Sequence, residues 1–286
     1  MTNKGRWITR LAVAFAFGAA IAGLPGCGDD AVKPSTTKTG IAAPTVPAEA
    51  AKVESAILAA YDAWNTKDTA KLLPYFTDRG LVAVITNNQP GATADSVKAT
   101  LADSIGVPKV RTNGFKNTRV TGATATTESA EVQGVVLGDA RYSLVNVAGA
   151  WKVDGLEWLN TPVPAGATTT HVDLTEFAFR GDTKELGVGS GALAIEASNV
   201  GTQPHELVIA KIPADAAIDD LVKTGNGFEF QGEIGPVEPG KTLNIVFTEP
   251  LAAGRYVMVC YLPDTTAGGD GMSHALKGMI REFTVK

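Results

Sequence analysis

The spacing of apolar residues changes along the first folded segment of the chain. From Ala48 to Asn65 they recur at helical spacing and share one face, which predicts an amphipathic helix. Further helices are expected at residues 69–76 and 95–105. The short run Leu81–Thr86 is apolar throughout and is interpreted as a buried strand. Alternating stretches then predict strands at residues 116–125, 129–136, 140–147 and 151–158.

Helices followed by a curved antiparallel sheet form an α+β arrangement. Short turns expected at residues 137–139 and 148–149 suit an antiparallel meander. The run Ala60–Asp68, followed by Leu72–Phe76, resembles the nuclear-transport-factor-2-like superfamily of cone-shaped domains. That superfamily includes ketosteroid isomerase and many binding modules, so the resemblance implies a cone-shaped domain over residues 48–160.

This segment offers little visible chemistry. It contains no histidine, and the expected strand Leu81–Thr86 has no acid where the isomerases keep their base. Four acids lie on later strands and point either inward or outward: Glu128, Glu131, Asp154 and Glu157. Four aromatic residues form either a small apolar pocket or ordinary core: Tyr61, Trp64, Trp151 and Trp158. We therefore expect no catalytic residue here.

Residues 161–169 are rich in Pro, Gly and Thr and predict a linker between two domains with separate cores. Beyond the linker, residues 171–179 alternate but change phase near Glu176, which suggests a bulged strand. A short helix is expected at residues 213–223. The remaining strands are expected at residues 192–198, 207–212, 242–247, 255–260 and 280–285. The pattern indicates an antiparallel β-sandwich over residues 170–286.

The second segment carries four candidate metal ligands: His205, Cys260, His274 and Met279. A thiolate, two imidazoles and a thioether are the donors that a soft, redox-active copper ion selects. A lone cysteine, by contrast, is usually a small buried apolar residue. The presence of the other three side chains favours a copper site.

Asn199-Val200-Gly201 before Pro204-His205, and His274 before Gly278-Met279-Ile280, resemble the two ligand loops of the cupredoxins. The resemblance covers nearly all of residues 170–286 and is to plastocyanin-like domains. It implies an all-β Greek-key sandwich that holds one copper ion. His205, Cys260 and His274 would then be equatorial ligands, and Met279 a long axial ligand.

Two features depart from the cupredoxin pattern. Thirteen residues separate Cys260 from His274, where the family has a much shorter loop. This Gly-rich insert either bulges outward and returns, or it marks a sandwich that binds metal loosely or not at all. Glu206 follows the first histidine, where plastocyanins carry an amide that braces the thiolate. The third histidine, His171, is expected to be a surface residue.

The N-terminus has the features of a targeting segment. Lys4, Arg6 and Arg10 precede an apolar run that is too short to span a bilayer comfortably. Leu24-Pro25-Gly26-Cys27 resembles the lipobox of bacterial lipoproteins, which implies removal of residues 1–26 and acylation of Cys27. A plain secretory signal and an uncleaved anchor are the alternatives. Each places the mature chain outside the cytoplasm, and residues 27–47 are expected to form a disordered tether.

Charge excludes one class of partner. The formal net charge is −5 and no basic block stands out, so we expect no binding to nucleic acid. The sequence as a whole predicts an extracytoplasmic, lipid-anchored copper protein without enzymatic activity, used for one-electron transfer or copper binding. The expected partners are the membrane, through the anchor, and a redox protein. The alternative is a metal-free binding lipoprotein with a small apolar pocket in its first domain.

Overall fold

The computed structural model describes residues 48–286 except positions 90, 107, 182–184, 187–192, 225–226 and 267. The predicted signal peptide (1–26), the lipidation site Cys27 and the tether (27–47) lie outside the described residues. The first half of the described chain is built from helices and strands that follow one another in this order: α1 (Ala48–Asn65), α2 (Thr69–Leu72), η1 (Leu73–Tyr75), α3 (Asp78–Thr86), α4 (Ala94–Ser104), β1 (Val110–Thr121), β2 (Thr124–Gln133), β3 (Val136–Val147) and β4 (Ala150–Leu159).

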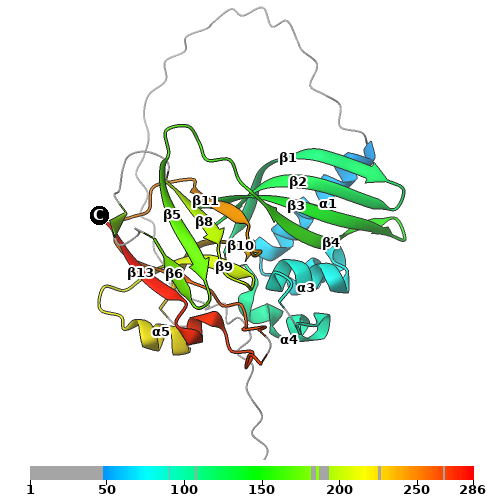
Figure 1. The fold of residues 1–286 in the computed structure, drawn as a ribbon. Helices are drawn as coiled ribbons and strands as arrows, with labels where there is room; N and C mark the ends of the chain where they lie inside the picture. Colours follow the sequence, from blue (N-terminus) through cyan, green and yellow to red (C-terminus); the bar gives the residue numbers. More distant parts are fainter. Residues whose placement is uncertain are drawn as a thin grey trace, which may run out of the picture.

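The second half consists mainly of strands: β5 (Thr168–Thr175), β6 (Ala178–Arg180), β7 (Glu185–Leu186), β8 (Leu193–Asn199), β9 (His205–Ile212), α5 (Ile218–Thr224), β10 (Glu229–Val237), β11 (Thr242–Phe247), β12 (Gly254–Val259), η2 (His274–Lys277) and β13 (Ile280–Val285). The chain is therefore an α+β half followed by a half dominated by β-structure (Figure 1). Among the described helices, none is long and apolar enough to cross a membrane.

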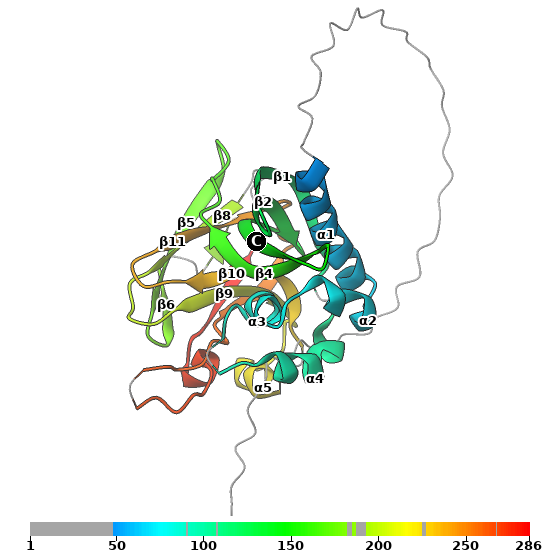
Figure 2. The ribbon, with the colours of Figure 1, turned by 90° about the vertical axis from the view of Figure 1, so that its right-hand side faces the viewer.

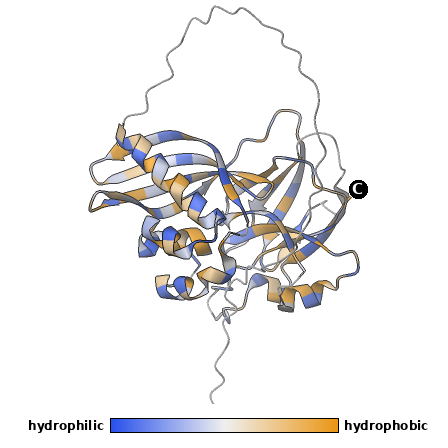
Figure 3. Cartoon of the chain, turned by 180° about the vertical axis from the view of Figure 1, so that it is seen from behind, coloured by the Kyte–Doolittle hydropathy of each residue, from blue (hydrophilic) through white to orange (hydrophobic). Residues whose placement is uncertain are grey.

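In the first half, α1 lies along one face of the antiparallel sheet made by β1–β4, with α3 and α4 beside it (Figure 2). Val53 and Ile57 lie on the buried face of α1, as the helical spacing predicts, whereas Leu58, which was expected on the same face, is exposed. The strands alternate between buried and more exposed positions, most regularly in β2, and Figure 3 shows the corresponding alternation of hydropathy. The predicted helices and the four later strands are confirmed in this part of the chain, with shifted ends.

The expectation of a strand at Leu81–Thr86 is wrong, because these residues belong to helix α3. The Thr77 side chain accepts a hydrogen bond from the backbone N–H of Gly80, and Asn87 ends the helix in the left-handed conformation. A short apolar run is compatible with both a strand and a buried helix. The capping residues at the two ends show that this segment is a helix. A Cβ at Gly80 would lie 2.0 Å from the Val153 carbonyl oxygen, so Gly80 lets α3 approach β4 closely.

One predicted turn and one predicted bulge are also corrected. Residues 137–139 lie inside β3, and the chain reverses between β2 and β3 at Gly134-Val135, where Gly134 has φ +59°. The predicted bulge near Glu176 is a hairpin turn, since Thr175 pairs with Ala178. Strand β10 was not expected from the sequence. In the two hairpins, the register between the paired strands decides where each strand ends.

One sheet runs through both halves, with the order β1-β2-β3-β11-β8-β5-β6, and β4 pairs with residues of β3 that follow those paired with β11. The second sheet has the order β10-β9-β12-β13-β7 and belongs to the second half. The link is made by β3 and β11, where Leu137 pairs with Val246 and Val136 with Phe247. The main cluster of buried apolar residues also includes side chains from both halves, so the expectation of separate cores is wrong. The domain boundary at residues 161–169 stays a prediction.

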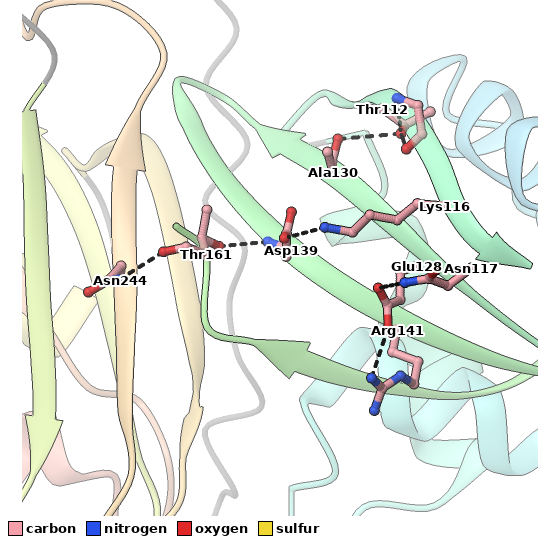
Figure 4. Close-up of polar contacts among 10 residues, drawn as sticks. Thr112, Lys116, Asn117, Glu128, Ala130, Asp139, Arg141, Thr161 and Asn244 are labelled. Atoms are coloured by element: carbon pink, nitrogen blue, oxygen red, sulfur yellow. Dashed lines mark hydrogen bonds and ion pairs between the residues drawn. The ribbon is translucent and has the colours of Figure 1, made fainter. Parts of the chain in front are cut away.

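Thr161, within the predicted linker, joins the two halves by hydrogen bonds (Figure 4). The backbone N–H of Asp139 donates to Thr161 Oγ1 (2.7 Å), and Asn244 Nδ2 donates to the Thr161 carbonyl oxygen (2.8 Å). At the nearby β2–β3 turn, Val135 N–H donates to the carbonyl oxygen of Gln231 (2.9 Å). Because these groups are mostly shielded from water, their hydrogen bonds fix the relative position of the halves.

Candidate metal centre

Three of the predicted ligands come from the same end of the second sheet. His205 is the first residue of β9, and Cys260 directly follows β12. β9 and β12 are antiparallel neighbours, with Val208 paired to Val259, so the start of one strand lies beside the end of the other. His274 begins the short helix η2, which precedes β13 in the same sheet.

The donor atoms of these three residues converge. Nδ1 of His205 lies 3.1 Å from Nδ1 of His274, and the latter atom lies 3.3 Å from Sγ of Cys260. One ligand atom from each residue lies within 4.8 Å of the other two. All three side chains are fully buried, at 0% exposure. Among the described residues, this is the group of histidine, cysteine and acidic side chains that could hold a metal ion.

The histidines are held in the neutral form. Burial lowers the pKa of His205 to about 4, and the neighbouring His274 contributes to the decrease. Burial also lowers the pKa of His274 below its ordinary value. A neutral imidazole has a lone pair available for a metal, whereas an imidazolium ion has none. Both rings are therefore ready to act as ligands at neutral pH.

Glu206 connects the first histidine strand to the cysteine. Its backbone N–H donates to Sγ of Cys260 (3.4 Å), and its Oε1 accepts a hydrogen bond from the backbone N–H of Tyr261 (2.9 Å). Glu206 is fully buried. The Glu206 carboxylate therefore braces the residue after the thiol, and it does not open the site to water.

Met279 lies against the other two ligand segments through its backbone. Its N–H donates to the His274 carbonyl oxygen (2.8 Å), and its own carbonyl oxygen accepts from the Cys260 N–H (3.2 Å). The Met279 side chain is fully buried. The structure thus brings His205, Cys260 and His274 into one cluster, and it places Met279 next to two of them in the fold. The role of each residue as a copper ligand remains a prediction.

The long insert between Cys260 and His274 turns outward and returns, as the first of the two alternatives expected. Pro263 and Ser273 form an antiparallel bridge, and Asp264 N–H donates to the Met272 carbonyl oxygen (2.8 Å). At its base, His274 N–H donates to the Leu262 carbonyl oxygen (2.8 Å). The first and last residues of the insert therefore lie side by side, so the added length does not separate the thiol from the second imidazole.

The donor set and its spacing fit a copper ion. Metal–nitrogen bonds of about 2.0 Å and metal–sulfur bonds of about 2.3 Å place neighbouring donors roughly 3.3–3.7 Å apart. The observed separations of 3.1 and 3.3 Å are slightly shorter, so a small outward movement of the side chains would accommodate an ion. A thiolate with two imidazoles and a weak thioether suits copper better than the hard cations, which prefer oxygen.

The four aromatic residues of the predicted pocket have different surroundings. Tyr61 Oη donates to Glu131 (2.6 Å), and Trp64 Nε1 donates to the Pro108 carbonyl oxygen (2.7 Å). Trp151 and Trp158 are buried in the core, and their Nε1 atoms have no hydrogen-bond partner among the described residues. Trp158 alone of the four contributes to a cavity of about 440 Å³, which lies where α3 and β4 meet the second half.

Sequence reasoning left open the direction of Glu131, which the structure resolves. Glu131 is buried at 3% exposure and accepts hydrogen bonds from Tyr61 and Tyr142, whose hydroxyl oxygens are 3.0 Å apart. Burial raises the pKa of both tyrosines well above the ordinary value, so both stay protonated donors. The alternation of buried positions in β2 was the available signal. None of these three residues lines the cavity of about 440 Å³.

Solved structures of two kinds are similar to parts of this chain. An auracyanin from Roseiflexus castenholzii is 26% identical over 42% of this chain and 99% of its own, with a TM-score of 0.29. Auracyanin A from Chloroflexus aurantiacus, described as a "blue" copper protein, is 25% identical over 42% and 100%, with a TM-score of 0.27. An NTF2-like protein of unknown function from Shewanella baltica is 13% identical over 42% and 100%, with a TM-score of 0.31.

The chain thus has both cupredoxin and nuclear-transport-factor-2-like proteins among its structural neighbours. No protein-family model and no curated protein sequence matches it. The TM-scores are low and each match covers less than half of the chain. Inferences about function therefore rest on the side chains of the site.

Proposed function

We propose that this chain is an extracytoplasmic, lipid-anchored copper protein that carries single electrons or holds copper. One copper ion would be bound by His205, Cys260 and His274, with Met279 as a weak axial ligand. The observation that carries the proposal is the convergence of a thiol and two neutral imidazoles, all fully buried, within 4.8 Å of one another.

The chain's own residues supply what such a site requires. A bound copper ion would accept and release one electron, and this donor set suits both of its oxidation states. His205 and Cys260 are anchored by paired strands, while the Glu206 N–H donates to the sulfur. Burial of the ligands excludes water from the coordination positions. A scaffold held in this way changes little when the charge of the site changes, which favours electron transfer over substrate turnover.

The location and partners are part of the same proposal. The lipobox-like segment Leu24-Pro25-Gly26-Cys27 supports lipid attachment at Cys27 and a place at an extracytoplasmic membrane surface. The site then requires a redox protein as its partner, and the net charge of −5 argues against nucleic acid. We propose no catalytic role for either half of the chain.

The test is copper loading of the purified chain, with the two cysteines as matched variants. Addition of copper(II) should give intense visible absorption and one copper per chain, and Cys260→Ala should abolish the absorption. Cys27→Ala should keep the absorption and lose the lipid, which mass spectrometry of membrane-extracted protein would detect. A wild-type chain that stays colourless and takes up no copper would refute the metal site.

A metal-free binding protein is the second candidate function. It is favoured by the cavity of about 440 Å³ between the halves, which is within the usual size range of ligand sites. Trp158 lines this cavity and has a buried Nε1 atom without a partner among the described residues. Trp158 fluorescence that changes on addition of small amphipathic compounds, in a chain that binds no copper, would support this candidate over the first.

A further inference from the structure

The turn between β5 and β6 lies between the two loops that provide the histidines. β5 ends at Thr175 and β6 begins at Ala178, so Glu176 and Phe177 are the two central residues of a hairpin. Thr175 Oγ1 donates to the Ala178 carbonyl oxygen (3.1 Å) and closes the turn. Neither central residue was assigned a part in the site from the sequence.

Glu176 holds the loop that leads to His205. Its Oε1 accepts hydrogen bonds from the backbone N–H and from Oγ1 of Thr202, the latter at 2.9 Å. These bonds lower the pKa of Glu176, with the backbone N–H of Thr202 as the largest cause. Gly201 is also in close contact, because a Cβ at that position would lie 2.7 Å from Glu176 Oε1. The loop is thus anchored three residues before the first histidine.

Phe177 covers the other histidine. Its ring meets the His274 ring edge-on, with the centroids 5.2 Å apart and the planes at 69°. Lys277 Nζ lies 5.0 Å from the centroid of the Phe177 ring, and the same ammonium group pairs with Asp264. Phe177 is partly exposed, whereas His274 is fully buried. The phenyl ring therefore lies between the imidazole and the solvent.

The backbone of Phe177 is unfavourable for this residue type. Its φ is +59°, a left-handed conformation that hairpin turns usually assign to Gly or Asn. A bulky residue there costs free energy that a glycine would not, so the turn is not built for stability alone. The strain is explained if the ring is needed against His274.

We infer that Phe177 is a positioning residue for the metal centre. It holds the His274 ring in place and shields it from water, while Glu176, one residue earlier, fixes the approach to His205. One turn therefore sets the spacing between the two imidazoles. As far as it concerns copper, this inference rests on the proposed function, but the shielding of His274 is a property of the metal-free chain.

The shielding is tested in the full, metal-free chain with diethyl pyrocarbonate, which modifies accessible imidazoles. The variants are Phe177→Gly, which removes both ring and strain, Phe177→Tyr, which keeps a ring, and Phe115→Leu, a partly buried control in the first half. Modified peptides are measured by mass spectrometry. His274 should react about tenfold faster in Phe177→Gly than in wild type. It should react at the wild-type rate in the other two variants.

The other histidines control for general loosening. His171 is exposed and should react equally in every variant, whereas His205 should stay protected in Phe177→Gly. Equal gains at His205 and His274 would indicate unfolding and would count against a specific role for Phe177. A His274 rate in Phe177→Gly within twofold of wild type would overturn the inference outright.

Copper provides the second readout and separates the two proposals. In copper-loaded protein, Phe177→Gly should lose the ion to a competing chelator about tenfold faster and should alter the ratio of the visible absorption bands, and Phe177→Tyr should restore both. If the wild-type chain takes up no copper, the proposed function fails while the pyrocarbonate result still decides the shielding. If copper binds and Phe177→Gly behaves as wild type in both assays, the inference fails alone.

Discussion

Nδ1 of His205 lies 3.1 Å from Nδ1 of His274, although the two residues are 69 positions apart in the chain. Two buried nitrogens with available lone pairs would repel each other at this distance unless a proton or a cation lies between them. The Cys260 sulfur, 3.3 Å from the same atom of His274, adds a third electron-rich donor. In the metal-free chain, an N–H of one neutral ring can donate to the lone pair of the other, and a bound metal ion would take the place of that proton.

Replacement of His205 should remove copper binding without unfolding the chain. His205→Ala leaves two equatorial donors and the weak axial thioether, which is too few for the trigonal site, so the visible absorption and the bound copper should be lost. His171→Ala is the matched control, because His171 is an exposed residue paired with Asp173 and Glu196. Metal analysis and absorption spectra check the prediction. Retention of the full spectrum by His205→Ala would contradict the assigned ligand set.

Glu206 should matter for stability through its hydrogen bond to Tyr261. Glu206→Ala leaves the N–H of Tyr261 without this acceptor and should lower the free energy of unfolding by about 1–3 kcal/mol. Glu206→Gln keeps an acceptor oxygen and should recover most of the loss. Chemical denaturation of the metal-free proteins measures both. Equal stability of the Ala and Gln variants would show that the hydrogen bond has no net effect.

Thr161 should stabilise the contact between the two halves. Thr161→Val keeps the shape of the side chain but removes the Oγ1 acceptor of the buried Asp139 N–H, at a cost of about 1–3 kcal/mol in the free energy of unfolding. Thr121→Val, at an exposed position at the end of β1, is the control and should change stability little. Thermal unfolding followed by circular dichroism is the measurement. A Thr161→Val protein as stable as wild type would exclude this hydrogen bond as a support.

His171 should make a small, pH-dependent contribution to stability. Its pKa is raised above 6.5 by a hydrogen bond to Asp173 first, and also by one to Glu196. A raised pKa in the folded state stabilises the fold fully below about pH 6.5, and this stabilisation is lost as the pH rises through the folded pKa. Because the side chain is 48% exposed, solvent screening keeps the effect below about 1 kcal/mol.

This pH effect is checked by NMR titration of His171 and by melting temperatures at several pH values. His171→Gln should lose the part of the pH dependence that lies above about pH 6.5. His171 in the wild type should titrate above the value of a free histidine. Titration at or below that value would contradict the two ion pairs.

Hydrophobic patterns predicted secondary structure correctly where the periodicity within one short stretch fits only a helix or only a strand. The helical spacing of Val53, Ile57 and Tyr61 predicted α1, and alternation predicted β2–β4, because amphipathic periodicity depends on neighbours in the chain. The sequence was misleading at Leu81–Thr86, where an apolar run suits both a strand and a buried helix. The choice of a helix depends on the packing of α3 against β4, where Gly80 lies close to Val153, and this contact is visible only in the tertiary structure.

By itself, the sequence determined the kinds of donor available to a metal: one thiol beside two imidazoles and a thioether in the second half. Only the tertiary structure decided that the insert after Cys260 returns to place His274 beside the sulfur, and that Phe177 covers this imidazole. It also decided that β3 and β11 join the two halves. The reason is that residue chemistry and periodicity are local, whereas the pairing of strands and the closure of loops depend on contacts between residues far apart in the chain.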